Sequence, residues 1–179
     1  MDRTVVIRGK NIVLQSANPE HKELLFLWST QSDATPFWYG DLYNEPIPTR
    51  KGFDDEFPDY YFDGSQQLKG RSFMVYIDNH PVGQINYNEI DLKKKCTEFD
   101  IIIASNSNQN RGVGTETVKL FTNWLFQKFD LEKIFVHVLE ANPRAIHVYE
   151  KAGYVFNRKY EEKERMCLEL INLRSSYKS

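Results

Sequence analysis

In the second half of its 179 residues the chain reads Gln109-Asn110-Arg111-Gly112-Val113-Gly114-Thr115-Glu116. Two glycines two residues apart let successive backbone N–H groups turn toward one point without a Cβ in the way. Apolar residues then recur at near-helical spacing and predict a helix that begins here: Val118, Leu120, Phe121, Trp124, Leu125 and Phe129. Because the N-terminus of a helix carries free N–H groups and a partial positive charge, the stretch predicts a phosphate cradle, to which Arg111 adds a full charge.

This cradle differs from two common nucleotide-binding motifs. It lacks the Lys-Ser/Thr of a P-loop, and Thr117 stands where a dinucleotide fingerprint needs its third glycine. A plain strand-to-helix turn is therefore an alternative interpretation. The helix dipole supplies only about 0.3–2 kcal/mol, whereas a micromolar ligand needs about 8 kcal/mol. A cofactor held here must make further contacts along a groove.

A second motif follows the predicted strand Lys133 to Leu139. It reads Asn142-Pro143-Arg144-Ala145-Ile146-His147-Val148-Tyr149-Glu150-Lys151-Ala152-Gly153-Tyr154 and predicts a helix with a polar start, a late tyrosine and a glycine stop. Gln-x-x-Gly-x-Gly followed by Asn-Pro-x-Ala-Ile-x-x-Tyr-Glu-Lys-x-Gly-Tyr resembles the GCN5-related N-acetyltransferase (GNAT) superfamily. The resemblance covers the chain from about Arg71 to Leu170.

The resemblance implies a cofactor and a set of residues that hold it. The cosubstrate would be acetyl-CoA, with no metal. Its pyrophosphate would lie on the backbone of Gln109, Asn110, Arg111, Gly112, Val113, Gly114 and Thr115. Asn142 would contact the pantetheine region, with Ala145 and Tyr149 beside it, and a backbone N–H of Ile102, Ile103 or Ala104 would polarise the thioester oxygen. Tyr149 would also act as general acid; without the resemblance it is a half-buried helix aromatic.

Two carboxylates, Glu98 and Asp100, share one face of the predicted strand Thr97 to Ala104. Asp100 lies twelve residues before Gly112, which resembles the aspartate of aminoglycoside 6′-N-acetyltransferases, whereas Glu98 lies where histone-type members carry a glutamate. An ammonium and an ordinary carboxylate differ by about 6 pKa units. A carboxylate here is therefore expected to anchor the ammonium, or to act through water after burial raises its pKa. The alternative is an exposed carboxylate at a sheet edge.

The segment from Pro36 to Asp63 mixes aromatic and acidic residues and is predicted to lie as an arm over a sheet edge, with a short helix capped by Thr49. Such a segment suits a polycationic, ring-bearing amine. The candidate substrate-binding residues are Trp38, Tyr39, Asp41, Glu98 and Asp100. Solvated acids and aromatics that simply cover the sheet are the alternative.

The first functional hypothesis is therefore an aminoglycoside 6′-N-acetyltransferase, an activity of the antibiotic-resistance type. One departure weakens it: His137 and Val138 replace the Asp-Pro that those enzymes usually carry before the motif asparagine. This departure is similar to the polyamine and ribosomal-protein branches, so spermidine and protein N-termini remain alternative acceptors. A non-catalytic acyl-CoA-binding module is the alternative from another class.

Length and composition set further bounds. A chain of 179 residues with a formal net charge of −2 predicts a single domain, 1–179, and does not suggest binding to nucleic acid. No apolar run approaches the length needed to span a membrane, so no membrane partner is expected. The family resemblance implies a small-molecule amine as the partner of a monomer or homodimer. Cys96 and Cys167 lack metal-site or redox spacing and predict free thiols in the cytoplasm. The four histidines have no partner by spacing and are expected in the surface or core.

The remaining patterns predict an α/β fold with a mixed, mostly antiparallel sheet of six to seven strands and helices on both faces, as the GNAT resemblance also implies. Val5 to Ile7 and Ile12 to Leu14 flank a turn at Gly9 and are expected to form one or two short strands, and a helix is expected from Pro19 to about Ser32. Two hairpins are expected, one formed by Arg71 to Ile77 with Val82 to Ile90, and the other by Tyr154 to Lys159 with Met166 to Leu170.

Overall fold

The computed structural model describes residues 4–40, 44–108 and 111–176. Three of the predicted site residues, Asp41, Gln109 and Asn110, lie outside this part of the chain. The strands are β1 (Val6–Arg8), β2 (Val13–Ser16), β3 (Arg71–Ile77), β4 (His80–Tyr87), β5 (Cys96–Ile103), β6 (Lys133–Leu139), β7 (Val155–Glu162) and β8 (Arg165–Leu173). The α-helices are α1 (Lys22–Gln31), α2 (Arg50–Glu56), α3 (Tyr60–Asp63), α4 (Val113–Lys128) and α5 (Pro143–Lys151). Among the described helices, none is both long and apolar enough to cross a membrane.

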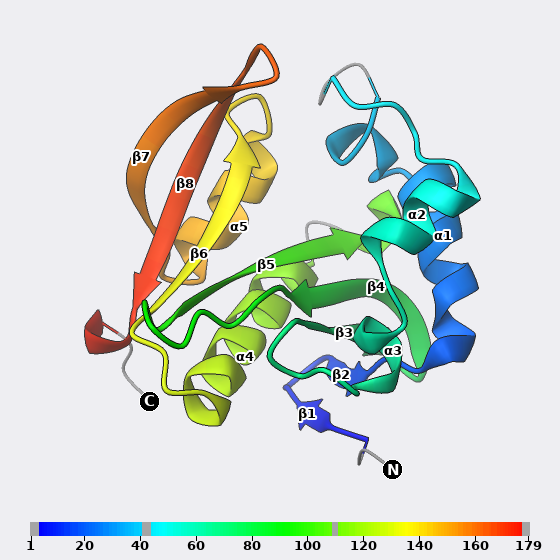
Figure 1. Cartoon of the computed structure of the whole chain (residues 1–179), viewed down its shortest axis with the longest axis horizontal. Helices are drawn as coiled ribbons and strands as arrows, with labels where there is room; N and C mark the ends of the chain where they lie inside the picture. The colour runs from blue at the N-terminus through cyan, green and yellow to red at the C-terminus, as the bar shows by residue number, and fades with distance from the viewer. Residues whose placement is uncertain (1–3, 41–43, 109–110, 177–179) are drawn as a thin grey trace.

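The eight strands form one sheet in the order β1-β2-β3-β4-β5-β6-β8-β7 (Figure 1). Every neighbouring pair is antiparallel except β5 and β6, which are parallel over only three residue pairs, Cys96–Lys133, Thr97–Ile134 and Glu98–Phe135. Beyond these pairs the two strands separate, so β6, β8 and β7 stand away from the first five strands (Figure 1). The sheet therefore opens between β5 and β6.

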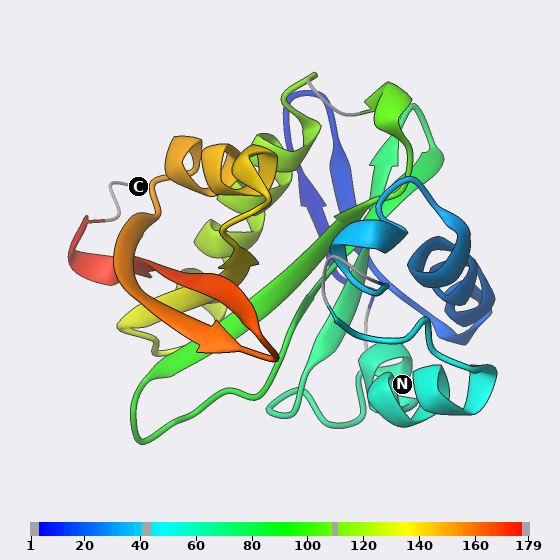
Figure 2. The ribbon, with the colours of Figure 1, turned by 90° about the horizontal axis from the view of Figure 1, so that it is seen from above.

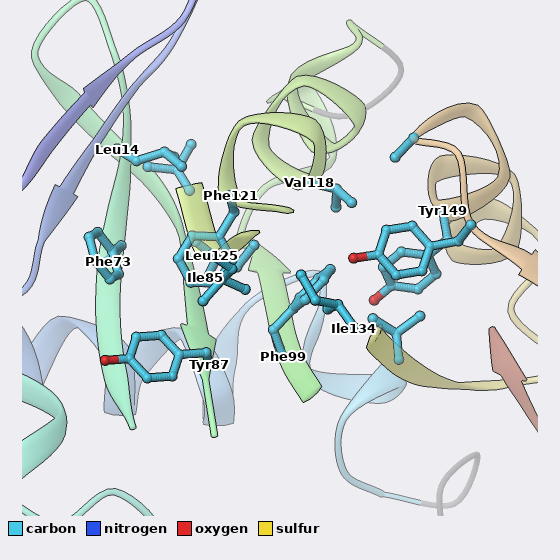
Figure 3. Packing of buried hydrophobic residues seen from close by; sticks show 14 of the residues in the cluster. Leu14, Phe73, Ile85, Tyr87, Phe99, Val118, Phe121, Leu125, Ile134 and Tyr149 are labelled. Carbon is cyan, nitrogen blue, oxygen red and sulfur yellow. The ribbon is translucent and has the colours of Figure 1, made fainter. Parts of the chain in front are cut away.

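One face of the sheet packs against α4 and α5. Phe121 of α4 lies 5.3 Å from Phe73 of β3 and 5.8 Å from Phe99 of β5, measured between ring centroids. Leu125 and Val118 of the same helix are also fully buried in this core (Figure 3). The apolar positions that predict a helix after the cradle are thus the positions that hold α4 on the sheet, each contributing about 1.5–3 kcal/mol by burial.

The opposite face carries the first three α-helices and the segment between them. Phe53, Phe57 and Tyr61 pack with Met74 of β3 and Ile102 of β5 in a second core. Figure 2 shows the blue and cyan helices on one side of the green strand β5, and α4 and α5 on the other. Side chains alternate between the two faces of a strand, which is why Phe73 and Met74 belong to different cores.

The structure confirms the α/β class and corrects three details. Eight strands are present instead of six to seven, because β1 and β2 pair as separate strands. The arm covers the face of the central strands β3 and β5 instead of a sheet edge, since its aromatics bury against Met74 and Ile102. Strand β8 continues to Leu173, which pairs with Lys133. Thr49 caps α2 as expected, with its hydroxyl accepting from the Gly52 N–H at 3.2 Å.

Candidate active site

A cleft of about 480 Å³ occupies the opening between β5 and β6. Strand β5 contributes Asp100 through Ile103 to its wall, and β6 contributes His137 through Leu139. The start of α4 and one side of α5 close the cleft on one flank. The other lining residues are Ala34, Phe37, Trp38, Tyr39, Glu56, Phe57, Gly112, Gly114, Thr115, Asn142, Arg144, Ala145, His147, Val148, Tyr149 and Lys151. Most of the described residues predicted from the sequence therefore meet in one cleft.

The first turn of α4 opens directly onto the cleft. Gly112 precedes the helix with a φ of +79°, a left-handed conformation that glycine adopts without strain. The Glu116 N–H donates to the Gly112 carbonyl at 2.9 Å, so the N–H groups of the three residues between them start the helix without an acceptor inside it. Gly112, Gly114 and Thr115 line the cleft, whereas Arg111 and Val113 do not. The cradle thus faces the cleft through its backbone.

Helix α5 begins at a capped asparagine. The Asn142 side-chain oxygen accepts from the Ala145 N–H at 3.1 Å, and Pro143 occupies the first turn. Both Asn142 and Ala145 also line the cleft. Asn142 therefore has a structural role that the motif did not reveal, in addition to its position beside the cleft.

Tyr149 lies between the core and the cleft. Its ring is buried and packs at 6.1 Å from Phe99 and 6.0 Å from Tyr154. Figure 3 shows the side chain projecting from α5 toward the sheet. Because Tyr149 also lines the cleft, the two interpretations of this residue, a core aromatic and a group at the site, are compatible.

Asp100 forms part of the cleft floor, and Glu98 lies next to it on the same face of β5. The Asn88 side-chain nitrogen donates to both carboxylates, at 3.0 Å to Glu98 Oε1 and 3.0 Å to Asp100 Oδ2. Asp100 is exposed toward the cleft, but the protein around it removes part of the hydration of its carboxylate. This desolvation raises the pKa of Asp100 to about 6, against the hydrogen bond from Asn88; the charge of Glu98 adds to the rise.

The backbone N–H and C=O groups of successive β5 residues point alternately toward β4 and toward the cleft. The Asn88 N–H donates to the Glu98 carbonyl at 2.9 Å, and the Ala104 N–H donates to the Val82 carbonyl at 3.0 Å. In an antiparallel pair, alternate residues direct both backbone groups toward the same neighbour. The N–H groups of Ile102 and Ala104 therefore point to β4, and those of Ile101 and Ile103 point to the side of β6, where the cleft lies.

The arm forms the wall opposite α5. Tyr39 donates to Glu56 Oε2 at 2.7 Å, and burial followed by the Glu56 charge raises the pKa of the Tyr39 phenol well above its ordinary value. Trp38 lines the same wall with Phe37. Of the acids of the described part of the arm, Glu56 alone lines the cleft.

The other acids of α2 and its surroundings form surface ion pairs. Asp54 contacts Lys22 at 3.2 Å, Asp55 contacts Lys51 at 2.7 Å, and Asp59 contacts Lys22 at 3.0 Å. The sequence contained a signal for this difference. Asp54 and Asp55 each follow a basic residue by four positions, which favours pairing along a helix, whereas Glu56 follows Gly52. Glu56 was nevertheless missed as a candidate.

His137 is a second residue that spacing did not reveal. Its Nε2 lies 3.4 Å from Glu98 Oε2, and its Nδ1 lies 2.6 Å from the Tyr160 hydroxyl. The histidines have no partner by sequence spacing, and the partners of His137 accordingly come from other strands, β5 and β7. It lies two residues past Phe135, the residue paired with Glu98, so no local pattern marks the contact.

The charged groups of the cleft are separated by sign. The α4 N-terminus and Lys151 come from the α4 and α5 side of the cleft, and Asp100 and Glu56 come from the side of β5 and the arm. Arg144 stacks over the Phe37 ring at 5.5 Å and donates to Asn106 Oδ1 at 3.4 Å. These two ends match an enzyme that moves a group from an anionic carrier to a basic acceptor.

A model of the acetyltransferase (GNAT) family matches residues 28–154. The chain belongs to this family and is an N-acetyltransferase. It is 27% identical over 159 residues to spermidine N(1)-acetyltransferase of Escherichia coli strain K12, covering 83% of this chain and 82% of that protein. It is 23% identical over 162 residues to aminoglycoside N(6')-acetyltransferase type 1 of Klebsiella pneumoniae, covering 84% and 78%.

Solved structures share the fold. AAC(6')-Ib in complex with paromomycin and acetyl-CoA superposes with a TM-score of 0.75 at 18% identity, covering 93% of this chain and 96% of that chain. Spermidine N-acetyltransferase of Vibrio cholerae, in complex with CoA and spermine, gives a TM-score of 0.76 at 19% identity, covering 94% and 98%. The comparisons thus include both kinds of amine acetyltransferase.

Proposed function

We propose that this N-acetyltransferase moves the acetyl group of acetyl-CoA to a primary amine of a polycationic small molecule, with an aminoglycoside 6′-amine as the first candidate. The observation that carries the proposal is the position of Asp100. It lies on the cleft floor, near Glu56 and Glu98, on the flank opposite the α4 N-terminus. An amine held there would face a thioester held along β5 and α5.

The residues of the opposite flank fit the cosubstrate. Phosphates suit the α4 N-terminus, whose N–H groups and dipole favour negative charge, and Arg144 and Lys151 add cations. The backbone N–H groups of Ile101 and Ile103 face the cleft and are the candidates to bind the carbonyl oxygen. Acetyl-CoA supplies the acetyl group as an activated thioester. Removing one donor from an oxyanion hole costs about 10²–10³ in kcat.

Asp100 has the properties of an ammonium anchor that also helps deprotonation. Its pKa of about 6 lies about 4 units below that of an ordinary ammonium, instead of about 6 units for an ordinary carboxylate. Proton transfer through a water molecule is correspondingly less uphill. Tyr149 would then protonate the leaving thiolate, because a phenol near pKa 10 and a thiol near 8.5 are close in acidity.

Spermidine is the second candidate acceptor, favoured by a separate observation. His137 and Val138 line the cleft where aminoglycoside 6′-N-acetyltransferases usually carry Asp-Pro, and the identity to the Escherichia coli spermidine enzyme, 27%, exceeds the 23% to the Klebsiella pneumoniae aminoglycoside enzyme. Both acceptors share the chemistry of several ammonium groups. They differ in the rings that the aromatic wall of Phe37 and Trp38 would contact.

The test is CoA release from acetyl-CoA by the purified chain with kanamycin, tobramycin, spermidine, or peptides with Ser or Ala at the N-terminus. Turnover of the aminoglycosides supports the first candidate, and turnover of spermidine the second. A preference for peptides contradicts the small-molecule proposal. Acetyl-CoA binding without turnover of any amine supports the non-catalytic module instead. Asp100→Asn should remove most of the turnover of the preferred amine. Asp55→Asn, which changes a surface acid of the arm, is its matched control.

A further inference from the structure

A row of amide side chains leads to the carboxylates of the cleft. Gln84, Asn86 and Asn88 are alternate residues of β4 and its extension, so they share one face of the sheet. Gln84 and Asn86 are fully buried. Burying polar groups is costly unless they are hydrogen-bonded, and the intervening residues Ile85 and Tyr87 are apolar core residues on the opposite face. The amide row therefore calls for a functional explanation.

Each amide in the row donates to the next. Gln84 Nε2 donates to Asn86 Oδ1 at 2.8 Å, and Asn86 Nδ2 donates to Asn88 Oδ1 at 2.9 Å. Asn88 Nδ2 then donates to Glu98 and Asp100, at 3.0 Å each. All three amides thus point their N–H groups toward the carboxylates, and such chains polarise one another.

The orientation of Asn88 is fixed from both sides. Its Oδ1 also accepts from the Tyr61 hydroxyl at 2.9 Å. Reversing the amide would set its NH₂ group against the Asn86 NH₂ group and its oxygen against two carboxylates, which are acceptors only when ionised. Asn88 can therefore satisfy its partners in one orientation only.

We propose that Asn88 is the positioning residue of the acceptor site, and that its oriented amide holds Asp100 beside Glu98, ionised and aimed into the cleft, to receive an ammonium group. This inference rests on the proposed function, because it gives Asp100 the amine. It assigns no contact between Asn88 and substrate; Asn88 acts through the two carboxylates.

The surroundings of Asp100 show why such a donor is needed. Glu98 lies on the same strand, Glu56 comes from α2, and the phenols of Tyr39 and Tyr61 face Asp100 from the arm and α3. His137 of β6 is on the far side of Glu98. Desolvation and the two neighbouring acids oppose ionisation of Asp100, whereas Asn88 and Asn86 favour it. The amide row thus stabilises the ionised form of Asp100, which desolvation and the neighbouring acids disfavour.

The test compares the full chain with Asn88→Ala. We expect the acid limb of the pH profile of kcat/KM for the amine to move to higher pH by about one unit, because a hydrogen bond to the ionised form is lost. The KM for acetyl-CoA should stay unchanged. Asn157→Ala is the matched control, since Asn157 donates to the Glu169 carboxylate at 2.6 Å outside the cleft lining. It should leave the acid limb in place.

A second measurement does not depend on turnover. The carboxyl resonance of Asp100, followed by NMR across the pH range, should titrate at higher pH in Asn88→Ala than in the unmodified chain. A shift without turnover of any amine contradicts the proposed function and supports the positioning role. Turnover of an amine with no shift of the Asp100 titration overturns the positioning role.

Tyr61→Phe keeps the ring and removes one of the two donors that orient Asn88, so it serves even if Asn88→Ala does not fold. We expect a smaller shift in the same direction. An unchanged Asp100 titration in Tyr61→Phe overturns the claim that the hydrogen bond from the Tyr61 hydroxyl helps to orient the Asn88 amide.

Discussion

Glu98 and Phe135 form the last residue pair that joins β5 to β6. Asp100 and His137 each lie two residues further along their strands, and both line the cleft. The site therefore begins where strand pairing ends. Backbone groups that would have joined the two strands face the cleft, which lets one structural break provide both the space and the polar groups.

Asp100→Asn should remove most of the acetyltransferase activity. The loss of the anchoring charge and of proton transfer is expected to lower kcat/KM by about 10²-fold or more. In the unmodified chain, kcat/KM should fall as the pH drops through about 6, since protonation discharges Asp100. Steady-state rates across pH with the best amine check both points. An acid limb that persists in Asp100→Asn would assign it to another group.

The same substitution should stabilise the fold at neutral pH. The pKa of Asp100 rises from its ordinary 3.8 to about 6 on folding, so the ionised form is less favourable in the folded chain. This penalty is complete above pH 6 and absent below pH 3.8. Asp100→Asn should therefore raise Tm at about pH 8 and lose this gain as the pH falls to about 4. Equal gains in Tm at both pH values would contradict a raised pKa of Asp100 in the folded chain.

Tyr149→Phe separates the general-acid role from the packing role. The ring contacts with Phe99 and Tyr154 remain in Tyr149→Phe, while kcat is expected to fall by about 10²-fold or more. Tyr154→Phe is the matched control. Its hydroxyl lies 2.8 Å from Thr122 Oγ1 in the core, so the loss should destabilise the fold by about 1–3 kcal/mol with kcat unchanged. Urea unfolding and initial rates distinguish the two.

Glu56→Gln should weaken binding of a polycationic acceptor. The carboxamide oxygen can still accept from Tyr39, so the wall should keep its shape while one charge is removed. Because Glu56 is exposed to solvent, we expect the KM for the amine to rise only about two- to five-fold, with the KM for acetyl-CoA unchanged. Asp55→Asn, on the same helix but paired with Lys51, should not alter either KM.

Gly112→Ala tests the cradle. A Cβ at this position meets no atom within 4 Å, but the φ of +79° is strained for any other residue, at about 1–2 kcal/mol. We expect lower stability and a higher KM for acetyl-CoA. Gly52→Ala, inside α2 with ordinary contacts around its Cβ position, should be neutral or stabilising by about 0.5–1 kcal/mol. A cradle variant with an unchanged KM would contradict the role of Gly112.

Much of the fold could be predicted from the apolar periodicity and the capping patterns of the sequence. The run from Val118 to Leu125 predicted α4, and Thr49 predicted the start of α2, because both signals are local. The position of the arm was predicted less accurately, since the aromatic and acidic residues of a segment do not show which strands that segment covers. Phe53 and Phe57 bury against Met74, a contact that exists only in the folded chain.

Residues of the cleft lining could be predicted where one motif contained them, as at Gly112, Gly114 and Tyr149. Glu56 and His137 were missed because their surroundings are assembled from separate segments. His137 meets Glu98 only through the short parallel pairing of β5 and β6, and the sequence contains no marker of where that pairing stops. The amide row escaped notice for the same reason, because Asn88 alone is an ordinary polar residue.

The acidic end of the cleft has a consequence for release of the product. Acetylation converts an ammonium group into a neutral amide, which has no charge to offer Asp100 and Glu56. The carboxylates that attract the substrate would therefore hold the product less strongly, and Asp100, which keeps its hydrogen bond from Asn88, would regain a cationic partner only when the next substrate arrives. In the proposed reaction, a strongly attracted substrate would replace a weakly held product at each turnover, and no conformational change would be needed for this exchange.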